Sequence, residues 1–96
     1  MRFVYKARYL KQFHRFSRQE QLLIHDSDRQ IRAYYATRQA PFGLRVKHLY
    51  GKGSLKIFEA RVTQATRIVW VEQNDTVYFG LVGSHNEVKQ YLRSLR

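Results

Sequence analysis

The fold is decided by two segments in the second half of the chain: residues 55–62, LKIFEARV, and residues 66–72, TRIVWVE. Apolar side chains alternate with others in both segments, and a period of two residues is the pattern of a β-strand. One face of the first strand carries Lys56, Phe58, Ala60 and Val62, and the opposite face carries Ile57, Glu59 and Arg61. In the second strand Ile68 and Trp70 lie opposite Arg67, Val69 and Val71. Both strands therefore belong to a sheet.

Two more strands are predicted around this pair. Residues 76–82 are apolar enough for a third strand, and they follow Asn74 and Asp75, which are typical of a tight turn. Residues 2–6 alternate weakly and predict a short strand at the N-terminus. The strands from residue 55 onward form a three-stranded antiparallel meander.

Three segments are predicted to be helical because their apolar residues recur at three- and four-residue steps. They span residues 8–16, 17–38 and 85–95. Ser17 and Glu20 fit a capping box, in which the serine caps a free N–H and the glutamate reaches back, so a new helix begins at Ser17. Residues 39–54, which include Pro41, Gly43, Gly51 and Gly53, break the periodicity and are predicted to form a basic loop.

The predicted order is one strand, two helices in an antiparallel hairpin, three strands and a closing helix. This order indicates an α+β fold in a single domain over residues 1–96. The helices would cover one face of the antiparallel sheet in a two-layer sandwich. The opposite face would be flat or concave and partly polar.

Charge is the strongest signal in the composition. The 96 residues contain 18 Lys and Arg against 7 Asp and Glu, a net charge of +11. Such an excess attracts polyanions: nucleic acid, an anionic membrane surface or an acidic protein partner. The absence of cysteine excludes disulfides, thiolate catalysis and cysteine-based zinc sites. Without a signal-peptide core or a long apolar stretch, the sequence predicts a soluble cytoplasmic protein.

Four side chains could cut RNA without a metal: His48 in the basic loop, Glu59 and Arg61 in the first strand, and His85 after the third. A base helps the 2′-hydroxyl attack the neighbouring phosphate, and an acid protonates the departing 5′-oxygen. A cation stabilises the charge that develops on the phosphorus oxygens. Histidine suits either proton-transfer role, since its ordinary pKa of about 6.5 lies near working pH. Spacing alone does not separate these catalytic roles from structural ones, because a surface histidine and an ion-paired strand arginine would give the same pattern.

Other basic residues have a better case as phosphate contacts than as catalysts. These candidates are Arg45, Lys47, Lys52, Lys56 and Arg67. Phe42 and Tyr50, in the same loop, could stack on bases. A solvated basic loop is the alternative. No two histidines lie at ligand spacing and carboxylates are few, so no metal site is predicted.

Several motifs together resemble those of a known family. The run LRVKHL at residues 44–49, the Gly51/Gly53 turn, FEARV at 58–62 and TRIVW at 66–70 resemble the RelE/ParE toxin superfamily. In that family a K-x-L-x-G stretch precedes a strand with an R-[VI] pair, and the next strand begins [YH]-R-[LVI]-[VI]-[YW]. The ending LVGSHNEV at 81–88 is similar to the histidine-bearing C-terminus of the YoeB and YafQ branch. The resemblance covers most of the chain, with motifs only in residues 44–88.

The resemblance implies a RelE-like fold and a toxin of a type II toxin–antitoxin system. Such toxins bind the ribosomal A site and cleave mRNA there without a cofactor, and an acidic antitoxin wraps and silences them. Operator DNA would be reached only through the antitoxin. A ParE-like gyrase inhibitor that acts by binding, or a non-catalytic RNA- or DNA-binding module, is the alternative.

The resemblance also assigns roles to residues. Arg61 matches the strand arginine that stabilises the scissile phosphate, and His85 matches the histidine implied as general acid. Lys47 and His48 match basic loop positions near the substrate, whereas Arg67 matches an arginine that is more often structural. The YoeB-type general base is a glutamate upstream of the loop, and residues 39–46 contain no acid. Glu59 or His48 would have to replace it, or the proton passes to water.

Overall fold

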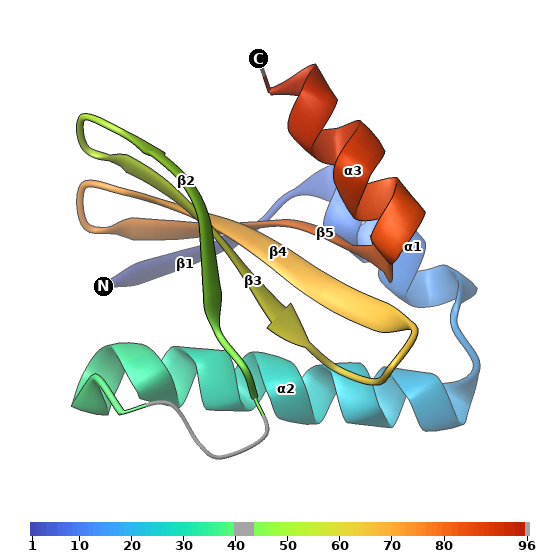
Figure 1. Ribbon diagram of the computed structural model, residues 1–96. Helices are drawn as coiled ribbons and strands as arrows, with labels where there is room; N and C mark the ends of the chain where they lie inside the picture. The colour runs from blue at the N-terminus through green and yellow to red at the C-terminus, as the bar shows by residue number, and fades with distance from the viewer. Residues whose placement is uncertain (40–43, 96) are drawn as a thin grey trace.

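The computed structural model describes residues 1–39 and 44–95, which form a five-stranded sheet with helices on both faces (Figure 1). The elements in chain order are β1 (Arg2–Tyr5), α1 (Ala7–Arg15), α2 (Arg18–Thr37), β2 (Lys47–Lys52), β3 (Leu55–Arg61), β4 (Thr66–Gln73), β5 (Thr76–Ser84) and α3 (His85–Ser94). The order across the sheet is β1-β5-β4-β3-β2. The predicted α+β class is confirmed.

Pairing within the sheet is mixed. β3, β4 and β5 form the predicted antiparallel meander, and Asn74, with φ of 56°, lies in the tight turn that joins β4 to β5. β1 pairs with β5 in parallel, with Tyr5 opposite Phe79. The sheet is therefore not purely antiparallel. The two helices carry the chain from β1 at one edge to β2 at the other, and the antiparallel strands then lead back to β5 beside β1.

The prediction of a loop throughout residues 39–54 is wrong for residues 47–52, which form the edge strand β2. β2 pairs antiparallel with β3, and its register shifts between His48 and Tyr50. That bulge interrupts the alternation of side chains, and lysine and glycine have low strand propensity. Pairing with β3, rather than local propensity, therefore determines this strand.

The main core lies between the sheet and helices α1 and α2. Trp70 and Phe79 from the central strands are buried there with Ile24 and Ile31 from α2. Burial of one such side chain stabilises the fold by about 1.5–3 kcal/mol. The Trp70 Nε1–H donates to the Tyr35 hydroxyl at 2.7 Å, so the polar atom of the largest buried side chain is satisfied.

A smaller core lies on the opposite face, under α3. Val88 of α3 packs there with Ile57, Val69 and Leu81 from the sheet. Figure 1 shows α2 on one side of the sheet and α3 on the other. The expectation that all helices cover one face is therefore wrong. The central strand β4 has apolar residues on both faces, and such a strand needs cover on both sides.

Helices α2 and α3 each begin with a capping box. Ser17 Oγ accepts from the Glu20 N–H while the Glu20 carboxylate accepts from the Ser17 N–H, as the sequence predicted. Ser84 and Glu87 form the same reciprocal pair at the start of α3. In the described residues no helix is both long and apolar enough to cross a membrane.

Candidate active site

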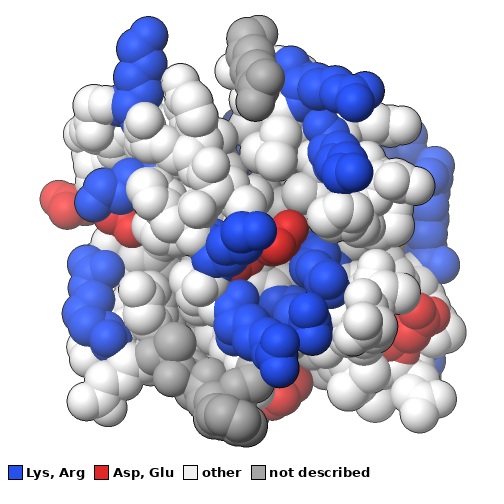
Figure 2. Space-filling model, viewed as in Figure 1, with Lys and Arg blue, Asp and Glu red and all other residues white. Residues whose placement is uncertain are grey.

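A basic groove lies on the α3 side of the sheet, at the end where β3 turns into β4. Its volume is about 340 Å³, and it is lined by Arg45, Val46, Lys47, Glu59, Arg61, Arg67 and His85. Figure 2 shows Lys and Arg side chains gathered around acidic atoms near the centre of this face. Four cations and one carboxylate give the lining a net charge of +3 with His85 neutral. The groove therefore favours an anion.

The strand register brings most of these side chains together. Glu59 and Arg61 are two residues apart on β3, so both point to the same face. Lys47 on β2 pairs with Glu59, and Arg67 on β4 pairs with Arg61. Three adjacent strands thus each contribute to one side of the groove.

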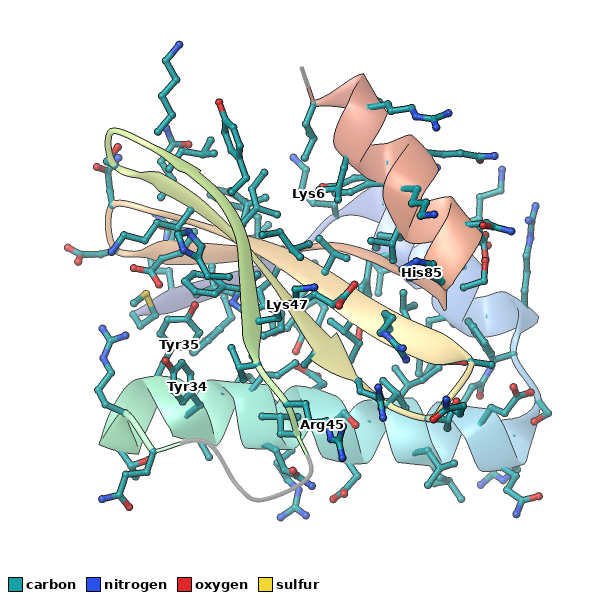
Figure 3. The ribbon with its side chains drawn as sticks, in the orientation of Figure 1. Lys6, Tyr34, Tyr35, Arg45, Lys47 and His85 are labelled. Atoms are coloured by element: carbon teal, nitrogen blue, oxygen red, sulfur yellow. The ribbon has the colours of Figure 1, made fainter. Side chains whose placement is uncertain are left out.

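The segment before β2 places Arg45 at the groove. Leu44 is 3% exposed in the main core, and its carbonyl accepts from the Arg61 N–H at 3.1 Å. Arg45 follows with φ of 52°, in the left-handed region, and lines the groove between Leu44 and Val46, which both pack in the main core. Figure 3 shows Arg45, Lys47 and His85, which come from three different segments and line the same groove.

His85 enters the groove as the first residue of α3. The first turn of a helix presents unpaired backbone N–H groups and a partial positive charge. The Ser84–Glu87 capping box satisfies two of the local N–H groups, those of Ser84 and Glu87. The side chain of His85 is exposed, so it is accessible to a substrate in the groove.

Arg67 is held by the protein itself. Its Nη1 donates to the carbonyls of Thr63 at 2.9 Å and Gln64 at 3.1 Å, in the β3–β4 turn. Its Nε lies 4.0 Å from Glu59 Oε2, and both side chains are 14% exposed. Arg67 therefore fixes the turn and orients Glu59. In the part of the chain that the structure describes, Arg45, Lys47 and Arg61 form no such ion pair.

Three of the predicted site residues lie away from the groove. The His48 ring packs on Phe58, with ring centroids 5.0 Å apart, and Phe58 belongs to the face turned toward α2. Lys56 is five residues before Arg61 on β3, about 17 Å along the strand, and Lys52 lies next to the distant β2–β3 turn. Tyr50 is 46% exposed and lines a separate apolar groove. Phe42 is outside the described residues.

Two features of the site were missed in the sequence. The capping box that positions His85 has the same S-x-x-E pattern that marked Ser17, and so could have been found. Leu44, which anchors the approach to Arg45, carries no comparable signal. No group of three or more His, Asp or Glu side chains among the described residues could hold a metal ion.

Comparisons with known proteins place the fold. No family profile and no curated protein sequence matches the chain. Among solved structures, a chain of the archaeal RelE–RelB complex from Pyrococcus horikoshii aligns with a TM-score of 0.68 and 15% identity, over 86% of this chain and 92% of that one. The YoeB/ParE toxin from Agrobacterium tumefaciens aligns at 0.65 and 19% identity, over 88% and 99%. A chain of the Escherichia coli DinJ–YafQ toxin–antitoxin complex aligns at 0.58 and 15% identity, over 90% and 93%.

These similarities establish the class of structure: the chain has the RelE-like fold of RelE, YoeB and YafQ toxins. The resemblance drawn from the sequence motifs is confirmed for the fold. At 12–19% identity, the similarity shows the fold alone. Any inference about function therefore depends on the residues that line the groove.

Proposed function

We propose that the protein is the toxin of a type II toxin–antitoxin system and that it acts as a metal-independent endoribonuclease on ribosome-bound mRNA. One observation carries the proposal: Arg61, Glu59 and His85 line a single basic groove. A phosphate clamp, a carboxylate and an imidazole are the groups that this cleavage requires. The fold shared with toxins supports the same function.

In the proposed reaction the 2′-oxygen attacks the adjacent phosphorus while the bond to the 5′-oxygen breaks. The products are a 2′,3′-cyclic phosphate and a free 5′-hydroxyl. Protonated His85 gives its proton to the departing 5′-oxygen. Arg61, which is free of carboxylate partners among the described residues, stabilises the negative charge on the phosphoryl oxygens.

Glu59 is the proposed base that accepts the proton of the 2′-hydroxyl. It is the carboxylate that lines the groove, and the 4.0 Å approach of Arg67 orients it. His48, the other candidate from the sequence, packs on Phe58 on the other face. Its position does not favour a role in this groove.

Purified protein with ribosomes and a defined mRNA tests the proposal. We expect cleavage that leaves cyclic phosphate and 5′-hydroxyl ends, and that persists in excess chelator as far as the ribosome itself tolerates it. Products with a 5′-phosphate would contradict the chemistry. Inhibition of DNA gyrase without RNA cleavage would favour the ParE-like alternative, and binding of nucleic acid without either activity would favour a non-catalytic module.

The proposed partner is a cognate acidic antitoxin, as in the complexes of RelE with RelB and of YafQ with DinJ. Opposite charge would draw such a partner to the basic groove. Beside it, on the same face, lies an apolar groove of about 210 Å³ lined by Leu49, Tyr50, Leu55, Ile57, Val71, Leu92 and Leu95. A segment that carries both acidic and apolar side chains would cover the two grooves.

Co-expression tests the partner. The product of the adjacent gene should form a stable complex and relieve growth arrest in the cytoplasm, where mRNA and ribosomes are found. If the protein is harmless when expressed alone and does not bind the product of the adjacent gene, most of the support for a toxin is lost.

A further inference from the structure

Glu87 joins the first turn of α3 to α1. Its Oε1 accepts from the Ser84 N–H at 2.9 Å, and its Oε2 accepts from Gln12 Nε2 at 2.6 Å. Gln12 belongs to α1, 75 residues away in the sequence. One carboxylate therefore caps α3 and ties it to another helix, with neither Glu87 nor Gln12 in the groove lining.

One further contact lies within α1 beside Gln12, and another crosses from α1 to α3. The Gln12 Oε1 accepts from Arg15 at 3.5 Å, and the Arg8 guanidinium lies 5.5 Å from the centroid of the Tyr91 ring on α3. Arg8, Gln12 and Arg15 follow one another at four- and three-residue steps, so they share one face of α1. That face is turned toward α3.

The backbone before α3 leaves room for Glu87. A Cβ on Gly83 would lie 2.9 Å from Glu87 Oε1, closer than such atoms approach. The Ser84 N–H lowers the pKa of Glu87 below its usual range, so the carboxylate is ionised and can accept at both oxygens. The junction is thus built around a charged acceptor.

His85 has few contacts of its own. It is exposed, and its imidazole makes no hydrogen bond to protein within the described residues. Its position in the groove is therefore set by the backbone of the first turn of α3, two residues from Glu87. Helix ends fray unless their free groups are satisfied.

We propose that Glu87 and Gln12 are positioning residues, which hold the first turn of α3 so that His85 stays at the basic groove. The consequence for catalysis rests on the proposed function, but the position of His85 does not. Displacement of an acid by about 1 Å can slow a reaction by up to about 100-fold.

Two variants test this proposal, and a third variant is the control for both. Gln12→Ala removes the link to α1 and leaves the capping box; Glu87→Gln weakens both. Glu20→Gln makes the same change in the capping box of α2, which lies outside the groove. In single-turnover cleavage we expect Gln12→Ala and Glu87→Gln to lower the rate by about 10- to 100-fold with unchanged affinity for mRNA-loaded ribosomes, and Glu20→Gln to match wild type.

NMR of the His85 ring supplies a measurement that needs no RNA. We expect the ring carbons of His85 to shift and gain mobility in Gln12→Ala and Glu87→Gln, and to remain as in wild type in Glu20→Gln. An unchanged His85 signal in both variants would overturn the positioning role. Mobile His85 in a protein that never cleaves RNA would uphold it and instead contradict the proposed function.

Discussion

Arg61 and Arg67 lie directly opposite each other on β3 and β4, yet their surroundings differ. Arg67 donates to the carbonyls of the β3–β4 turn and approaches Glu59, whereas Arg61 forms no ion pair among the described residues. Two like charges across a strand pair destabilise a sheet unless a counter-charge is near. Glu59 supplies that counter-charge, so one arginine is structural and the other is available for function.

This difference predicts opposite behaviour on substitution. Arg67→Ala should lower the free energy of unfolding by about 1.5–3 kcal/mol, since it removes hydrogen bonds from a charged donor at a nearly buried site. Arg61→Ala should change it by less than about 0.5 kcal/mol, because it removes a partly exposed side chain that forms no ion pair with the described residues. Urea unfolding of both variants checks this. Equal decreases would mean that Arg61 also has a structural role.

The buried carboxylate of Asp28 should make the stability of the fold depend on pH. It is 6% exposed, accepts from the Tyr5 hydroxyl at 2.8 and 2.6 Å, and has Arg32 Nε at 3.6 Å. Burial raises the pKa of Asp28 above 3.8, against the lowering effects of Tyr5, Arg32 and His25. Because the folded state binds the proton more tightly, the stability that Asp28 contributes is complete below its unfolded pKa and falls as pH rises through its folded pKa.

Asp28→Asn removes this titration and keeps an oxygen for the Tyr5 hydroxyl. We therefore expect the variant to gain stability relative to wild type as pH rises from about 3 to 7. Urea midpoints across that range measure the difference, with His25→Gln as the control for histidine titration. If the wild type instead gained stability relative to the variant over the same pH range, the folded state would stabilise Asp28 as an anion.

At the scale of single residues, the sequence could predict much of the groove. Glu59 and Arg61 share a face because a strand has a period of two, and the alternation of residues 55–62 made that visible. Lys47 and His48 could not be separated in the same way. Neighbours in a strand point to opposite faces, and the loop predicted there concealed which of the two would face the groove.

At the scale of elements, α3 depends on one glycine beneath it. A Cβ on Gly80 would clash with the Tyr91 hydroxyl. Gly80 also lies where the β4–β5 register shifts: Val69 pairs with Leu81, and Trp70 with Phe79. The bulge and the missing side chain together let Tyr91 pack across β5.

Gly80→Ala should therefore destabilise the protein by about 1–3 kcal/mol through overpacking. Removing the hydroxyl in Gly80→Ala/Tyr91→Phe should restore part of that stability, and Tyr91→Phe alone should cost little. A double-mutant cycle by thermal unfolding gives the coupling. Additive effects would mean that the two groups do not compete for space.

The elements that local sequence determines were the ones predicted. β3, β4, β5 and all three helices carry periodicity or turn signals of their own, and β1 carries the weak alternation that predicted a strand at residues 2–6. The parallel partnership of β1 and β5, the edge strand β2 and the placement of α3 on the second face depend on long-range pairing. The alternation of apolar residues in one strand does not specify which strand pairs with it.

At the scale of the whole molecule, the net charge of +11 favours polyanions but does not specify where on the surface they would bind. Arg45 and Lys47 line the groove, while Lys52 and Lys56 lie away from it with the same charge. These two pairs allow a matched comparison of phosphate contacts.

Removing one protein cation that neutralises a phosphate of single-stranded RNA should flatten the plot of log affinity against log salt by about 0.7. Arg45→Ala/Lys47→Ala should flatten it by about 1.4, and more than Lys52→Ala/Lys56→Ala does. Filter binding over a salt series with a short RNA gives both slopes. A larger effect from the Lys52 and Lys56 pair would place the RNA along the distant end of β2 and β3.

Arg61 and His85 are proposed to perform chemistry on RNA in one groove. Single-turnover cleavage of mRNA on purified ribosomes by wild type, His85→Ala and Arg61→Ala tests it most directly. We predict rate decreases of about 10²–10⁴-fold for removal of the acid and about 10²–10³-fold for removal of the phosphate clamp, in folded proteins that still bind ribosomes. Equal rates in all three proteins would contradict the claim.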